Sequence, residues 1–96
     1  MRLFTMKDKD FVTSLSRGLT LLESFTADWP RLTLQELAQR SELPRTTVFR
    51  LLKTLMTLGY VRYDEKRKEY FLGTRVMKLG FTVLNSMNLK DVARPY

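Results

Sequence analysis

The sequence contains no cysteine and no histidine among its 96 residues. Zinc sites are nearly excluded, because Zn²⁺ draws mainly on those two side chains. Catalysis by a cysteine nucleophile or a serine–histidine triad is excluded as well, and the four glycines form no phosphate-cradling loop. We therefore expect no metal, no cofactor and no enzymatic activity.

Long apolar runs are also missing. None reaches the roughly 18 residues that a membrane-spanning helix needs. The opening MRLFTMKDKDFVT places charges where a signal peptide needs an apolar core. The absence of cysteine fits a reducing compartment. We expect a cytoplasmic protein that does not contact a membrane.

Charge of one sign is in excess. Seventeen Lys and Arg stand against ten Asp and Glu, for a formal net charge of +7. At this length and with 44% hydrophobic residues, the chain predicts one small domain with a small core. A basic domain attracts polyanions, although charge alone also fits a merely soluble protein.

The N-terminal part is predicted as a loose arm over residues 1–11, followed by a helix. Ser14 is a plausible N-cap for that helix, and Trp29-Pro30 ends it, because a residue before proline avoids the α region. Steps of three and four residues place the apolar side chains of this segment on one helix face: Val12, Leu15, Leu19, Leu22 and Phe25.

A second, short helix is predicted to start at Thr33. Thr33 and Glu36 have the spacing of a capping box, and a tight turn follows at residues 41–43. Pro44 suits the first position of a third helix, and Gly59 suits the left-handed residue after its end. These two helices predict a helix-turn-helix whose second member, 44–58, enters the DNA major groove.

The third helix has two different faces. At 100° per residue, one side gathers Val48, Leu51, Leu52 and Leu55, and the opposite side gathers Thr46, Arg50, Lys53 and Thr57. The outer side carries no carboxylate, which is unusual for a generic exposed helix face. Because arginine pairs with guanine O6 and N7, and lysine reaches guanine or phosphate, we expect Arg50 and Lys53 to contact DNA.

The start of this helix offers further candidate contacts. Backbone N–H groups there favour a phosphate, with Arg45, Thr46 and Thr47 beside them; local capping is the alternative for the two threonines. Phe49 contacts a thymine methyl or a sugar, or it covers the flank of the core. Both alternatives stay open at this stage.

Residues 60–72, YVRYDEKRKEYFL, have β-formers at both ends and charges between them. They predict a hairpin with residues 64–69 as its tip, and helix, helix, helix, hairpin is the winged helix-turn-helix order. The wing would reach the flanking backbone or minor groove through Arg67, beside Lys66 and Lys68, unless its acidic residues leave the tip solvated. Arg31 and Thr33, before the second helix, are candidate phosphate contacts.

A further helical pattern covers 74–87 and carries a wide apolar surface. We expect this linker helix to pack on a partner, a second chain or a missing domain, through Val76, Leu79, Val83 and Leu84. Residues 88–96 open another helical pattern that the chain does not complete, so we expect a fragment of a longer protein. A dimer would double the readout across a palindromic site.

Residues 12–94 resemble the N-terminal DNA-binding region of the IclR-type bacterial transcriptional regulators. VTSLSRGLTLLESF, LTLQELAQRSELPRTTVFRLLKTLMTLGYV and YFLGTRVMKLG carry the resemblance. Glu42 stands where many helix-turn-helix sequences have glycine, and the wing tip lacks the glycine that the family often has there.

This resemblance implies a two-domain repressor or activator that binds operators as a dimer or higher oligomer. Its winged helix-turn-helix domain (12–73) and linker helix (74–87) would be followed by a C-terminal effector domain, absent here, that begins in 88–96 and senses a small metabolite. We therefore predict sequence-specific binding of double-stranded DNA on the bacterial nucleoid. The alternative is a winged helix that binds proteins and no nucleic acid.

Overall fold

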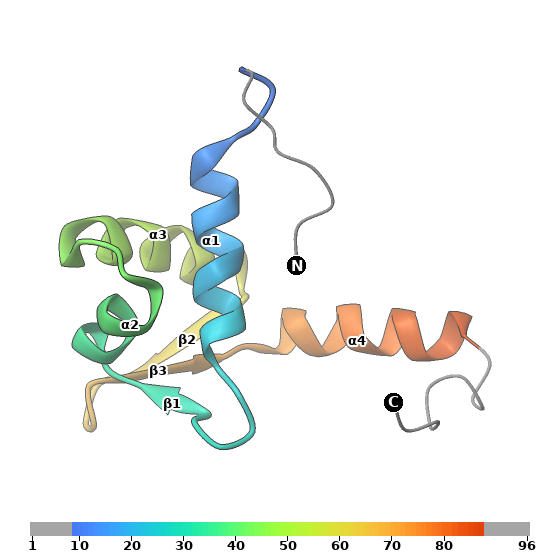
Figure 1. The fold of residues 1–96 in the computed structure, drawn as a ribbon. Coiled ribbons are helices and arrows are strands. Elements are labelled where there is room, and N and C mark those ends of the chain that lie inside the picture. Colours follow the sequence, from blue (N-terminus) through green and yellow to red (C-terminus); the bar gives the residue numbers. More distant parts are fainter. Residues whose placement is uncertain (1–8, 88–96) are drawn as a thin grey trace.

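The computed structural model describes residues 9–87, and residues 1–8 and 88–96 lie outside the described part. The elements are α1 Thr13–Ser24, β1 Arg31–Leu32, α2 Leu34–Ser41, α3 Arg45–Leu58, β2 Val61–Asp64, β3 Glu69–Leu72 and α4 Thr74–Ser86. Three helices and a small sheet form one body, and α4 extends away from it (Figure 1). The predicted mainly helical, winged helix-turn-helix fold with a following helix is confirmed.

The core is entirely apolar apart from one phenol. Its members come from every element except α4: Leu21, Phe25, Leu32, Leu37, Val48, Leu52, Val61 and Tyr70. Among the described residues, no polar or charged side chain other than the Tyr70 phenol is buried. Burial, and to a lesser extent the neighbouring Tyr63, raises the pKa of the Tyr70 phenol above its ordinary value of 10.0. The rings of Tyr63 and Tyr70 lie 4.6 Å apart between centroids, so the two side chains pack against each other. The raised pKa keeps the Tyr70 phenol neutral in the core.

The first half of α1 is exposed, unlike its predicted apolar face. Leu15 is 62% exposed and Leu19 is 49% exposed, whereas Leu21 and Phe25 are buried. In Figure 1 the start of α1 rises above the rest of the body. Leu15 and Leu19 line an open hollow that is also lined by Leu51, Leu55 and Leu58 of α3, and they stay largely exposed there. Ser14 is also not the N-cap, because that position falls on Val12, whose side chain makes no capping hydrogen bond.

The sheet has three strands, one more than the sequence predicted. β1 pairs antiparallel with β3, which pairs antiparallel with β2, giving the order β1-β3-β2. Alternation across the strands sends Leu32 and Tyr70 into the core. On the opposite face Arg31 and Arg62 both stand next to Phe71 in the register.

The ends of α2 and α3 follow the sequence signals closely. Thr33 and Glu36 form the predicted capping box of α2. Glu42 takes the left-handed conformation at φ 59° and ψ 35°. This is the position where many helix-turn-helix sequences have glycine. Pro44 is the N-cap of α3, one residue before its predicted place in the first turn, and Gly59 ends α3 at φ 90°.

Gly73 connects the wing to α4 and is buried. Its N–H donates to the Tyr60 carbonyl at 2.8 Å, so the start of α4 is tied to the chain just after α3. Thereafter α4 has no buried residue. Within residues 9–87, no helix has both the length and the apolar character needed to cross a bilayer.

Candidate nucleic-acid interface

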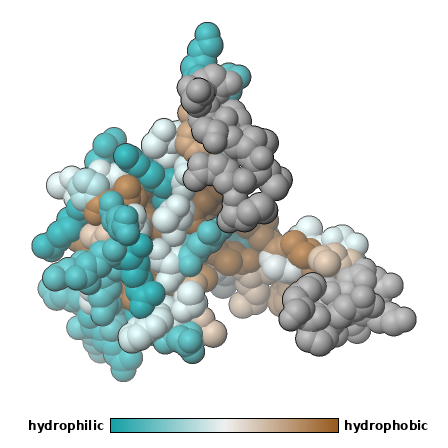
Figure 2. All heavy atoms as spheres, viewed as in Figure 1, coloured by the Kyte–Doolittle hydropathy of each residue, from teal (hydrophilic) through white to brown (hydrophobic). Residues whose placement is uncertain are grey.

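The outward face of α3 has the composition that the sequence predicted. Val48 and Leu52 are buried on its inner side, while Thr46, Arg50 and Lys53 are exposed. Thr47 is half-buried beside the groove between α1 and α3. In Figure 2, hydrophilic residues gather over α2, the start of α3 and the wing, whereas hydrophobic residues appear where α4 leaves the body.

The cations of α3 are not neutralised by the protein. The helix contains no carboxylate, and in the described chain Arg45, Arg50 and Lys53 form no ion pair. The Lys53 ammonium nitrogen lies 5.5 Å from the centre of the Phe49 ring, a cation–π contact. Three positive charges without an ion-pair partner in the described chain therefore lie at exposed positions of α3, available to an anion.

The start of α3 presents unused hydrogen-bonding groups. The N-cap Pro44 has no side-chain capping bond, and neither Thr46 nor Thr47 has a hydroxyl partner among residues 9–87. The structure thus contains no local capping by these threonines. Their hydroxyls and the first-turn N–H groups can all serve a phosphate or a base edge.

Phe49 is 46% exposed and lies outside the core cluster. Its ring lines a shallow hollow with Leu34 of α2 and with Arg45, Thr46 and Arg50. This placement fits both alternatives, because the ring is open to a ligand and also lies beside Leu34, which packs against the core. An exposed apolar ring in a hollow that two arginines also line is suited to the thymine methyl or the sugar.

Thr33 is engaged within the protein. Its hydroxyl oxygen accepts from the Glu36 N–H at 3.1 Å, and its own N–H donates to a Glu36 carboxylate oxygen at 2.9 Å. The hydroxyl hydrogen is not used in either bond. Thr33 therefore supports α2 and still has one donor for its predicted phosphate contact.

We expect Thr33→Ala to lower the free energy of unfolding by about 1 kcal/mol, because the Glu36 N–H in the first turn of α2 loses its acceptor. Thr33→Ser keeps the hydroxyl and should restore most of this loss. Urea unfolding followed by circular dichroism measures both variants. An alanine variant as stable as the wild type would show that the capping box contributes nothing.

Arg31 lies on β1 at the base of the wing and has two partners. Its Nη1 is 3.4 Å from Oδ2 of Asp64, and its guanidinium carbon is 4.3 Å from the centre of the Phe71 ring. Arg62 on β2 lies 5.5 Å from the same ring centre. Sequence reasoning did not nominate Arg62, although strand alternation after the core residue Val61 places it on the outer face.

Arg67 lies at the wing tip with an exposed side chain. The tip is narrower than predicted, residues 65–68, because Asp64 still pairs with Glu69. Lys68 adopts the left-handed conformation at φ 58°. Residues 9–87 contain no acidic cluster that could hold a metal ion.

The predicted partner surface of α4 is exposed. Val76 is half-buried, and Leu79, Val83 and Leu84 are 56%, 52% and 44% exposed. Met77 and Phe81 add to this surface at 55% and 54%. A wide apolar helix face open to solvent is typical of a surface that another element covers.

The fold is a winged helix-turn-helix, in which three helices are followed by a charged hairpin. Helices α2 and α3 form the helix-turn-helix, and the outer face of α3 is basic. This arrangement defines a protein of the DNA-binding class. Comparison with known proteins narrows this class to a family. Residues 14–65 match the IclR helix-turn-helix domain, and the chain belongs to the IclR family of transcriptional regulators.

Individual relatives show the same likeness. The chain is 40% identical over 89 residues to the Pca regulon regulatory protein of Pseudomonas putida, covering 93% of this chain and 30% of that one. It is 37% identical over 84 residues to the transcriptional repressor IclR of Escherichia coli, covering 88% and 31%. Curated relatives include repressors and an activator.

A solved structure agrees in fold. The crystal structure of an IclR family regulator from Brucella abortus superposes with a TM-score of 0.81 at 38% identity, over 97% of this chain and 35% of that chain. The chain thus spans about a third of the length of the relatives it matches.

Proposed function

We propose that this chain is the operator-binding part of a ligand-responsive regulator and binds double-stranded DNA in a sequence-specific way. Helix α3 enters the major groove, where Arg50 and Lys53 face base edges and Arg45, Thr46 and Thr47 approach the backbone. Arg31 and Thr33 approach phosphates, and Arg67 brings the wing to the flanking backbone or minor groove.

The observation that carries the proposal is the unpaired basic face of α3. A helix that binds another protein has no general reason to lack carboxylates, whereas on a helix in the major groove each carboxylate is repelled by the nearby phosphates. Arg45, Arg50 and Lys53 also leave their charges uncompensated in the described chain. We therefore favour nucleic acid over a protein partner.

The same proposal includes a homodimer or higher oligomer held by α4. A dimer would bury the exposed face of Val76, Leu79, Val83 and Leu84 and would align two copies of α3 with a palindromic operator. Because the relatives are about three times longer, we place a small-molecule effector in a C-terminal domain outside this chain. Such a regulator has no enzymatic role and works on the nucleoid in the bacterial cytoplasm.

The test is affinity selection of fragmented bacterial genomic DNA on this chain at moderate salt, followed by sequencing. Enrichment of a two-fold-symmetric site would support both specificity and pairing of two chains. Uniform retention would mean that binding is through charge alone and would contradict specificity. No retention would favour the protein-binding alternative.

On the selected site, Arg50→Ala should weaken binding about 5- to 150-fold, the range expected for one arginine that reads a guanine. On unrelated duplex of equal length the loss should be small. Lys78→Ala removes one positive charge from exposed α4 and serves as the control, with little effect on either DNA. Fluorescence anisotropy measures the affinities of the wild type and both variants for the two duplexes. Equal losses on both duplexes would assign Arg50 to phosphate.

A further inference from the structure

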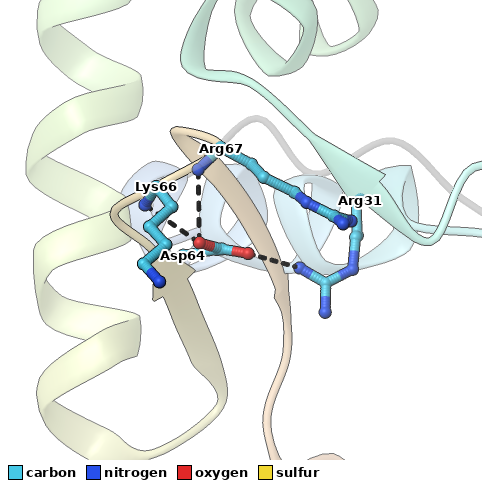
Figure 3. Close-up of polar contacts among 4 residues, drawn as sticks. All are labelled: Arg31, Asp64, Lys66 and Arg67. Atoms are coloured by element: carbon cyan, nitrogen blue, oxygen red, sulfur yellow. Dashed lines mark hydrogen bonds and ion pairs between the residues drawn. The ribbon is translucent and has the colours of Figure 1, made fainter.

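Asp64 stands out among the charged residues of the wing because of the contacts that its carboxylate makes. Residues 62–69 hold four cations and three carboxylates, and the side chain of Asp64 bonds to two separate parts of the chain. Figure 3 shows its carboxylate between the wing-tip backbone and the Arg31 guanidinium.

One oxygen of Asp64 shapes the tip. Oδ1 accepts from the Lys66 N–H at 3.0 Å and from the Arg67 N–H at 3.2 Å. The Asp64 carbonyl accepts from the Lys68 N–H at 2.7 Å. This arrangement is an Asx-type turn, in which the side chain replaces a backbone acceptor. It closes the hairpin without glycine, even with Lys68 in the left-handed region.

The other oxygen reaches a different strand. Oδ2 lies 3.4 Å from Nη1 of Arg31 on β1, whose guanidinium also lies over Phe71. One carboxylate therefore links the tip to the first strand of the sheet. Arg31 uses only one of its five N–H donors in this contact, and its side chain is 40% exposed, so the remaining donors are available to a phosphate.

We infer that Asp64 is a positioning residue of the DNA-binding surface: it holds the wing tip and the Arg31 guanidinium in the geometry in which both meet the DNA backbone. This inference rests on the proposed function. Because the two groups are already ordered before binding, less conformational entropy is lost when the protein binds DNA. Asp64 thus strengthens binding even though its charge repels phosphate.

The inference predicts that Asp64→Ala changes DNA affinity in the direction opposite to the one expected from charge alone. Removing a carboxylate from a surface that faces phosphates should strengthen DNA binding. Asp64→Ala should instead weaken it, by about fivefold at 0.15 M salt for each phosphate that the protein no longer reaches, and the salt slope should fall by about one for each such phosphate.

Glu65 provides the matched control. It is the adjacent residue, it is exposed, and its side chain has no partner among the described residues. Glu65→Ala removes the same charge from the same tip and leaves the hydrogen bonds to Asp64 in place. Its affinity for duplex should stay equal to the wild type or rise.

Asp64→Asn separates the two oxygens, because the amide oxygen still accepts from the Lys66 and Arg67 N–H groups but gives no charge to Arg31. Amide hydrogen exchange at these two residues should stay slow in Asp64→Asn and become fast in Asp64→Ala. The affinity of Asp64→Asn should lie between wild type and Asp64→Ala. In an Arg31→Ala background, Asp64→Asn should not weaken binding further, and the loss of its charge should leave the affinity equal or higher.

The affinities are measured by fluorescence anisotropy on one duplex across a salt series, after circular dichroism has shown that each variant is folded. A weaker Asp64→Ala beside an unweakened Glu65→Ala supports the inference. Equal strengthening by both alanine variants would overturn it and leave the proposed function intact. A wild-type chain that binds no duplex would overturn the proposed function and, with it, any role of Asp64 in DNA binding.

Discussion

Leu52→Ala is expected to lower the free energy of unfolding by about 2–5 kcal/mol, because apolar burial is removed and a cavity is left behind. Leu52 is fully buried on α3 and belongs to the same cluster as Leu21 of α1, Leu37 of α2 and Val61 of β2. The cavity would open where three helices and the sheet meet, so no single element can move in to fill it. The total free energy of unfolding of a native protein is commonly only about 5–15 kcal/mol.

Leu58→Ala is the control for this prediction, since it is the same substitution on the same helix at a residue that is 52% exposed. Its effect should stay within about 0.5 kcal/mol, as for most surface changes. Urea unfolding followed by circular dichroism gives both values. Equal losses at the two positions would mean that the core lies elsewhere than between α1, α2 and α3.

Gly73→Ala is expected to destabilise the domain by about 1–3 kcal/mol, the usual cost of forcing atoms into a packed site. A Cβ at position 73 would lie 2.5 Å from the Gly59 carbonyl oxygen and 3.3 Å from the Tyr60 carbonyl carbon. These are backbone atoms, so no side chain can rotate away. Either α4 or the turn after α3 has to shift, and the 2.8 Å bond from Gly73 to Tyr60 is strained with it.

Gly18→Ala is the matched control, because an added Cβ there meets nothing within 4 Å. Gly18 lies inside α1, where alanine is favoured over glycine by roughly 0.8–1.0 kcal/mol. The two glycine-to-alanine changes should therefore shift the thermal midpoint in opposite directions. A Gly73→Ala variant with an unchanged midpoint would show that the close approach of 73 to 59 relaxes at no cost.

Elements with a local code were predictable from sequence. The Thr33–Glu36 capping box, the glycine after α3 and the two faces of α3 each depend on residues within one or two helical turns of one another. Thr46, Arg50 and Lys53 were therefore placed outward correctly. Their contacts with DNA remain predictions, as do those of the other candidate residues.

Features that depend on distant parts of the chain were not predictable. β1 has only two residues, too short for an alternation pattern, and it forms through pairing with residues 70 and 71. Apolar spacing placed Leu15 and Leu19 on one face of α1, but whether a neighbour reaches that face is decided by how α3 packs. The Arg31–Asp64 pair joins residues 33 positions apart, and no local sequence pattern predicts it.

The outward face of α3 shares no atoms with the core, and this separates two properties that many proteins must compromise between. Thr46, Arg50 and Lys53 are exposed and have no hydrogen-bond or ion-pair partner for their side chains in the described chain. Substitutions there alter the chemistry offered to a base pair at little cost to folding. If the proposed operator binding holds, such a domain would change its target site through single exposed residues, while Leu52 and its neighbours keep the scaffold unchanged.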